Sequence, residues 1–77
     1  MTENKIENKV ERIANATVKS YIQDGYKLQW YEFNEISQLA IYRIIHSNGN
    51  NIKVIGDVIK NKIIIFLNGK LNKTISL

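Results

Sequence analysis

Hydrophobic and polar positions recur along this chain with two different periods, and the change of period separates a helix from a set of strands. Between residues 5 and 22, apolar side chains return every three or four positions, as on one face of an amphipathic helix. Asn4 with Glu7 three residues later is a capping pattern at its start, and Gly25 suits the turn beyond its end. We predict a helix over about residues 5–22.

The clearest strand signal lies near the end of the sequence. Asn68-Gly69 separates two β-prone runs, and this dipeptide favours a type I′ turn, which needs a positive φ at both central positions. The pattern predicts an antiparallel hairpin with strands over residues 63–67 and 70–76.

A two-residue turn fixes which residues of this hairpin share a face, because paired residues point to the same side. The expected core face carries Ile64, Phe66, Leu71, Ile75 and Leu77. The other face is still half apolar, which is unusual for a solvated sheet face. We therefore expect a helix or a partner chain to cover it, and its candidate protein or dimer interface is Ile63, Ile65 and Leu67.

Three further strands are predicted between the helix and the hairpin. Residues 26–33 alternate, with Trp30 expected in the core. Residues 39–46 are rich in β-branched side chains, although residues 34–47 also fit a second helix. Residues 51–59 form the next strand, in which Gly56 marks a bulge or a close approach.

These elements predict the fold class and the domain organisation. Short connections make consecutive strands antiparallel neighbours. The expected fold is α+β, with the N-terminal helix packed on a twisted antiparallel meander of four to five strands. Residues 1–77 form one small domain.

Charge is spread unevenly over the chain, whose formal net charge is +4. Residues 38–77 hold six basic side chains and one acidic one, whereas residues 1–37 are close to neutral. Such asymmetry indicates an anionic partner, or else lysines that keep strand edges soluble. Tyr31 beside Lys27 on an outer face is a candidate for stacking a base. The candidate nucleic-acid contacts of the basic half are Arg43, Lys53, Lys60, Lys62, Lys70 and Lys73.

No catalytic motif is present in the sequence. The single histidine, His46, lies near Tyr42 and Arg43, and such a set occurs in small ribonucleases of the toxin kind, which makes this activity a remote alternative. There is no cysteine and the carboxylates lack ligand spacing, so no metal or cofactor is predicted. We expect a protein that is not an enzyme.

The remaining features favour a small cytoplasmic binding protein. The longest apolar run, residues 63–67, is far shorter than a membrane span. Frequent Lys, Ile and Asn indicate an A/T-rich genome, and size and composition resemble those of small phage or mobile-element proteins. The predicted function is binding through protein–protein contacts, as a homodimer or with a host protein. Sequence-nonspecific binding of DNA or RNA by the basic half is the alternative.

Overall fold

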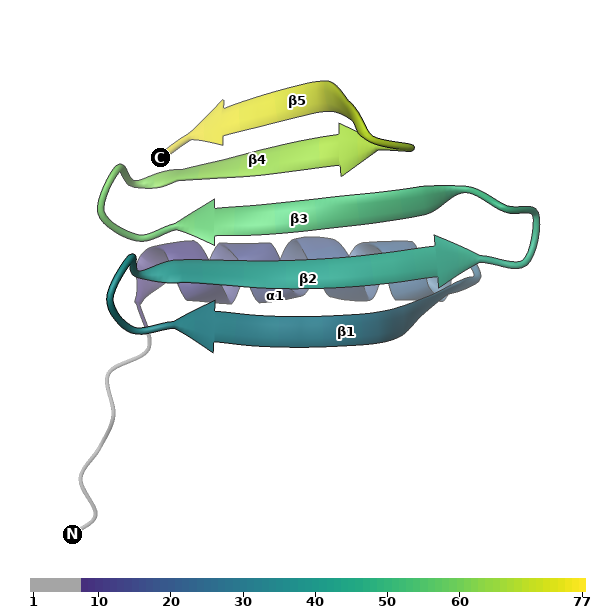
Figure 1. The fold of residues 1–77 in the computed structure, drawn as a ribbon, viewed down its shortest axis with the longest axis horizontal. Coiled ribbons are helices and arrows are strands. Elements are labelled where there is room, and N and C mark those ends of the chain that lie inside the picture. Colours follow the sequence, from purple (N-terminus) through teal and green to yellow (C-terminus); the bar gives the residue numbers. More distant parts are fainter. Residues whose placement is uncertain (1–7) are drawn as a thin grey trace, which may run out of the picture.

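A computed structural model describes residues 8–77 as one helix packed on one five-stranded antiparallel sheet (Figure 1). The elements are α1 (Lys9–Gln23), β1 (Tyr26–Asn34), β2 (Leu39–His46), β3 (Asn51–Asp57), β4 (Lys62–Leu67) and β5 (Lys70–Ser76). Each strand pairs with the next along the chain, in the order β1-β2-β3-β4-β5. The predicted α+β meander is confirmed, and residues 39–46 form a strand in place of the alternative second helix.

Helix α1 begins after Asn8, whose side-chain Oδ1 accepts a hydrogen bond from the Val10 backbone N–H at 2.7 Å. A side-chain oxygen in this position satisfies one of the free N–H groups of the first turn. The predicted start near Lys5, with Asn4 as cap, lies outside the described residues. Val10, Ala14 and Val18 are buried, and their four-residue spacing places them on the one stripe that meets the sheet.

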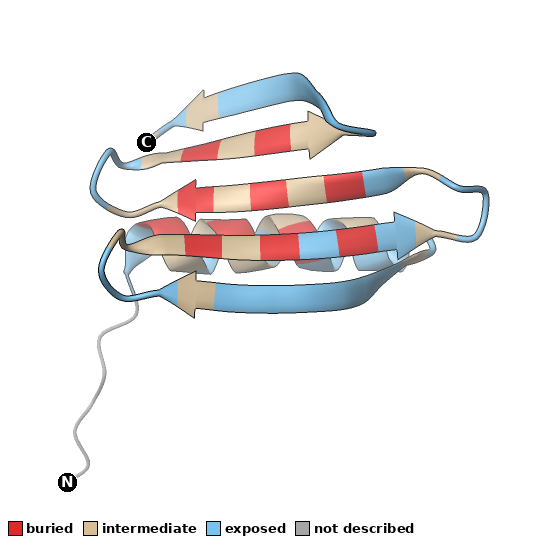
Figure 2. Ribbon diagram, in the orientation of Figure 1, coloured by how far each residue is buried: buried red, intermediate tan, exposed pale blue. Residues whose placement is uncertain are grey.

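The core lies between α1 and the inward faces of the three central strands. Figure 2 shows buried positions alternating along β2, β3 and β4. Gly56 lies beneath the helix, where an added Cβ would stand 3.2 Å from Val10 Cγ1 and 3.3 Å from Ala14 Cβ. Of the two alternatives predicted for this glycine, a bulge or a close approach, the close approach is confirmed. The buried strand residues are Ala40, Tyr42, Ile44, Ile52, Val54, Ile63 and Ile65.

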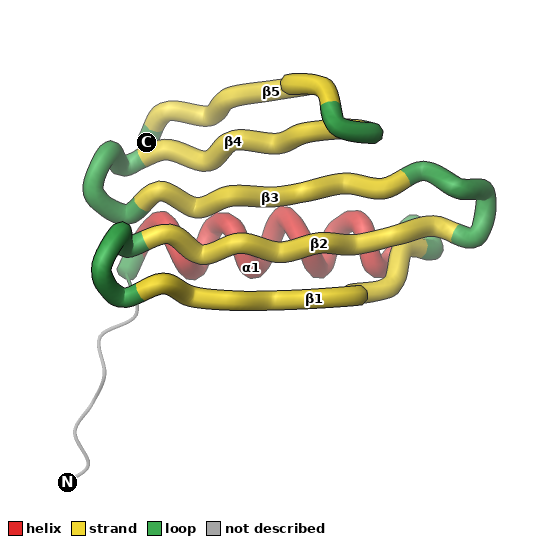
Figure 3. The backbone as a smooth tube through the Cα atoms, viewed as in Figure 1, coloured by secondary structure: helices red, strands yellow, loops and turns green. Residues whose placement is uncertain are grey.

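Short turns connect the consecutive strands (Figure 3). Asn68 and Gly69 have φ of 51° and 84°, the positive values that a type I′ turn requires. The third predicted strand, over residues 51–59, ends earlier than expected at Asp57. The carboxylate Oδ1 of Asp57 accepts a hydrogen bond from the Lys60 backbone N–H at 3.0 Å, which closes the turn into β4.

The faces of the hairpin β4–β5 differ from the prediction. Phe66 pairs with Leu71 as expected, but the register then shifts by one residue, so that Ile65 pairs with Lys73. The shift leaves Asn72 as an extra residue on β5, which is the geometry of a β-bulge. Relative to the side chains before Asn72, the side chains after it therefore lie on the opposite face from the one that unbroken alternation assigns.

The predicted protein or dimer interface of Ile63, Ile65 and Leu67 is wrong in its placement. Ile63 and Ile65 are 0% and 2% exposed in the core beneath α1, and Leu67 is half-buried against the same core. The chain's own helix covers this face. Ile64 and Phe66, expected in the core, are half-buried on the opposite face of the sheet.

The edge strand β1 contains a second irregularity, which turns its tryptophan out of the core. The register shifts between Leu28 and Trp30, so Gln29 is the extra residue and Trp30 pairs with Arg43. Trp30 is 43% exposed, and the prediction that it lies in the core is wrong. Tyr31 pairs with Tyr42, on the side of the sheet that carries α1.

Candidate functional site

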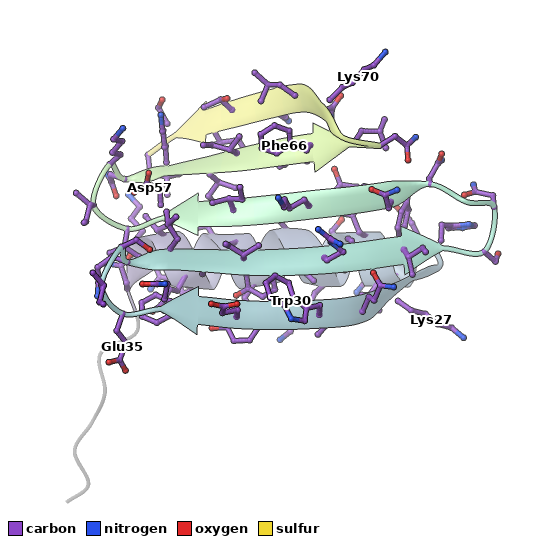
Figure 4. The ribbon with its side chains drawn as sticks, in the orientation of Figure 1. Lys27, Trp30, Glu35, Asp57, Phe66 and Lys70 are labelled. Carbon is purple, nitrogen blue, oxygen red and sulfur yellow. The ribbon has the colours of Figure 1, made fainter. Side chains whose placement is uncertain are left out.

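The face of the sheet opposite α1 is covered by no other element of residues 8–77, and we call it the open face (Figure 1). Side chains on this face form rows across the strands, because paired residues share a face. In one row, two aromatic rings flank two cations, and Figure 4 shows Trp30 and Phe66 standing on β1 and β4. This aromatic–cationic row consists of Trp30, Arg43, Lys53, Phe66 and Leu71, from β1 to β5.

The two cations of the row are direct cross-strand partners. Arg43 on β2 pairs with Lys53 on β3. Like charges in directly opposite positions destabilise a sheet, and they create a local positive potential that attracts anions. The row itself contains no acidic side chain to offset this charge. A bound anion at this position would relieve the repulsion.

The row beside the aromatic–cationic row is largely apolar. It contains three half-buried isoleucines in successive strands, and its one charged residue is the acidic Glu32 at the β1 end. An apolar strip beside the cations lowers the local dielectric and strengthens their field. The members of this row are Glu32, Ile41, Ile55, Ile64 and Thr74.

A shallow hollow lies at the β1 end of the aromatic–cationic row. It has a volume of about 340 Å³ and is lined by Gln29, Trp30 and Arg43. The hollow lies at the bulge, where the extra residue Gln29 interrupts the regular pairing of β1 with β2. An indole face, a guanidinium and an amide provide stacking and hydrogen-bond donors, which are the groups proteins use to hold nucleic-acid bases.

Only part of the predicted basic set comes together. Arg43 and Lys53 adjoin on the open face, and Lys62 lies on the same face opposite Asp57. Lys60 lies in the turn between β3 and β4. The remaining two, Lys70 and Lys73, pair with Leu67 and Ile65 and so belong to the face that carries α1.

Tyr31 and His46 lie on the opposite side of the sheet from Arg43, Lys53 and Lys62. The Tyr31 ring lies 4.8 Å from the ring of Tyr42, which is in the core on the α1 side. The His46 ring packs edge-on against Tyr26 at 4.9 Å, and its Nδ1 accepts the Asn48 backbone N–H at 3.0 Å. Tyr42 and His46 therefore lie on the opposite face from Arg43, and these three residues do not form a joint site.

Two larger hollows lie elsewhere and have less distinctive chemistry. One, of about 580 Å³, lies beside His46 and is lined by the strand residues Lys27, Ile45 and His46 and the turn residues Gly25, Ser47 and Gly49. The other, of about 480 Å³, lies between α1 and β5 and has Lys73 as its only charged lining residue. Within residues 8–77 no group of three potential metal ligands occurs, and no helix there has the length and apolar character to cross a membrane.

The residues missed by sequence reasoning are Gln29, Trp30 and Phe66. The signal that points to them lies in β3, where Asn51, Lys53 and Asp57 alternate with apolar residues. That alternation identifies the odd-numbered positions of β3 as the outward ones, and antiparallel pairing carries the assignment to Phe66 on β4.

Comparison of this chain with protein-family models, with curated proteins and with solved structures found no match.

Proposed function

We propose that this protein binds single-stranded nucleic acid on its open face, without catalysis and with little dependence on sequence. The observation that carries the proposal is the aromatic–cationic row, in which Trp30 and Phe66 flank the Arg43–Lys53 pair. Single-strand-binding proteins combine aromatic rings that stack bases with cations that track the phosphates. The row supplies both groups in one line across the sheet.

The dimensions of the row suit a single strand crossing the sheet. Trp30 and Phe66 are three strand spacings apart, or roughly 14 Å at about 4.8 Å each. A nucleic-acid strand that follows the row meets one ring, then the two cations, then the second ring. A duplex keeps its base faces stacked inside the helix, so flat rings on a sheet favour an unpaired strand.

An anionic partner also fits the row better than an apolar protein surface does. Covering Arg43 and Lys53 with apolar side chains would remove two like charges from water without a counter-charge, which is costly. Phosphates provide that counter-charge. The prediction of a protein partner rested on Ile63, Ile65 and Leu67, and the first two are in the core.

The salt dependence of binding tests the proposal. Each phosphate contact on a single strand contributes about −0.7 to the slope of log K against log salt concentration. The double variant Arg43→Gln, Lys53→Gln is expected to make that slope shallower by about 1.4, measured by fluorescence anisotropy with a labelled oligonucleotide.

A matched control removes the same charge from the other face. Lys70→Gln with Lys73→Gln also lowers the net charge by two, but these residues pair with Leu67 and Ile65 on the α1 side. The control is expected to leave the slope close to that of the wild type. Equal losses in both double variants would show that binding depends on net charge alone and would refute the open face as the site.

Self-association is a second candidate function, and it is favoured by a different observation, the outer edge of β1.

A further inference from the structure

Strand β1 is an edge strand whose outer side pairs with no other strand in residues 8–77. Such an edge displays free backbone N–H and C=O groups that can pair with another strand. It also carries large apolar side chains: Leu28 is 49% exposed and Tyr31 is 48% exposed, and both lie on the side that carries α1. Ile22, near the end of α1, is another exposed apolar residue.

The strand at the opposite edge, β5, has features that keep edge strands from pairing with other chains. It contains Lys70 and Lys73 among a largely polar sequence, and lysine is a common means of keeping an edge strand unpaired. β1 has a single lysine, Lys27, and one carboxylate, Glu32. Among the exposed large apolar side chains of the described residues, three lie on β1 and one, Leu71 at 63% exposed, lies on β5.

The bulge at Gln29 makes the outer edge of β1 complementary to itself. Because of the extra residue, Leu28 and Tyr31 share the α1 side of the sheet, although three positions separate them. Lys27 and Glu32 share the open face for the same reason. In a regular strand, residues at these odd spacings would lie on opposite faces.

We propose that two copies of this chain pair antiparallel through β1, about a two-fold axis that passes between Gln29 and Trp30. In this register Lys27 of each copy lies opposite Glu32 of the other, and Leu28 lies opposite Tyr31 of the other. All four positions meet on matching faces, as antiparallel partners must. A register shifted by one residue sets Leu28 opposite Glu32, which lies on the other face.

The pairing joins the two five-stranded sheets into one continuous sheet. A two-fold axis perpendicular to the sheet keeps both helices on one side and both open faces on the other. The two aromatic–cationic rows then lie on the same surface, with their Trp30 ends nearest the axis. Self-association itself does not require nucleic acid, so it is tested without any.

The test is the molecular mass of the full chain in solution, measured by sedimentation equilibrium over a range of concentrations. The wild type is expected to approach twice the 8.9 kDa chain mass as concentration rises. Lys27→Glu is expected to weaken the dimer roughly 10-fold, because it places like charges opposite each other at two symmetric positions. Glu32→Lys alone is expected to do the same.

The double variant Lys27→Glu, Glu32→Lys decides between this register and a general loss of folding. It restores opposite charges across the two-fold axis, so it is expected to recover most of the wild-type affinity. Lys70→Glu on β5 makes the same charge change away from β1 and is expected to leave the dimer intact. A wild type that stays monomeric at its highest soluble concentration, or a double variant no tighter than the single ones, would overturn the proposal.

Discussion

Replacing Ile63 with alanine is expected to lower the free energy of unfolding by about 2–5 kcal/mol, as typically found when a buried isoleucine is truncated. Ile63 is fully buried between α1 and the sheet, so truncation removes apolar contacts and leaves a cavity. A chain of 77 residues has a total stability of roughly 4–12 kcal/mol at the usual value per residue. The substitution therefore removes a large part of the stability. Urea unfolding followed by far-UV circular dichroism measures the loss.

Ile64 is the matched control, because it is the same residue type one position along β4 and points to the open face. Ile64→Ala is expected to cost about 1 kcal/mol, since its side chain is only half-buried. If the alanine variant fails to fold, Ile63→Val replaces it, and this smaller truncation is expected to lower the free energy of unfolding by about 0.5–1.5 kcal/mol. A larger loss for Ile64→Ala than for Ile63→Ala would mean that the faces of β4 are reversed.

Replacing Trp30 with alanine is expected to weaken binding of a short single-stranded oligonucleotide by roughly 5- to 150-fold. The range corresponds to about 1–3 kcal/mol for each base stacked on an aromatic ring. Phe66→Ala is expected to have an effect in the same range, because Phe66 is the second ring of the row. Fluorescence anisotropy with a labelled oligonucleotide of about six nucleotides measures both, a length within the usual site size of one module.

Tyr31→Ala is the control for Trp30→Ala. Tyr31 is the next residue of β1 and has a similar exposed fraction, but its ring lies against Tyr42 on the α1 side. Its loss is expected to leave the affinity for the short oligonucleotide unchanged, because one open face accommodates that length without a second copy. If Tyr31→Ala weakened binding as much as Trp30→Ala, stacking on the open face would be refuted.

Much of the fold follows from local signals in the sequence. Asn68-Gly69 predicted the β4–β5 turn because few other dipeptides tolerate a positive φ at two successive positions. The helical periodicity predicted a stripe that contains Val10 and Ala14, and both meet the sheet; Val18, which the predicted stripe left out, is buried with them. Gly56 within a strand predicted a bulge or a close approach, and in the structure an added Cβ there would meet the helix.

The positions of the candidate site were harder to predict, because two bulges decide them. Residues 63–67 are all apolar, so alternation alone does not distinguish the two faces of β4. The assignment of the two faces of β4 then rests on β5. Leu71 and Ile75 would share a face in an unbroken strand, but the extra residue Asn72 between them places them on opposite faces. On β1, the extra residue Gln29 likewise moves Trp30 to the opposite face from the one that unbroken alternation assigns. A bulge of this kind depends on pairing with the neighbouring strand and leaves no clear mark in the strand's own residues.

The central claim, that the open face stacks nucleic-acid bases, is tested most directly by the fluorescence of Trp30. This is the only tryptophan of the chain, so its emission reports on that face alone. Titration with a short mixed-sequence single strand at low salt is predicted to quench the emission to a plateau, with recovery as salt is added. Emission that stays constant while anisotropy shows the oligonucleotide bound, or no binding at low salt, would contradict the claim.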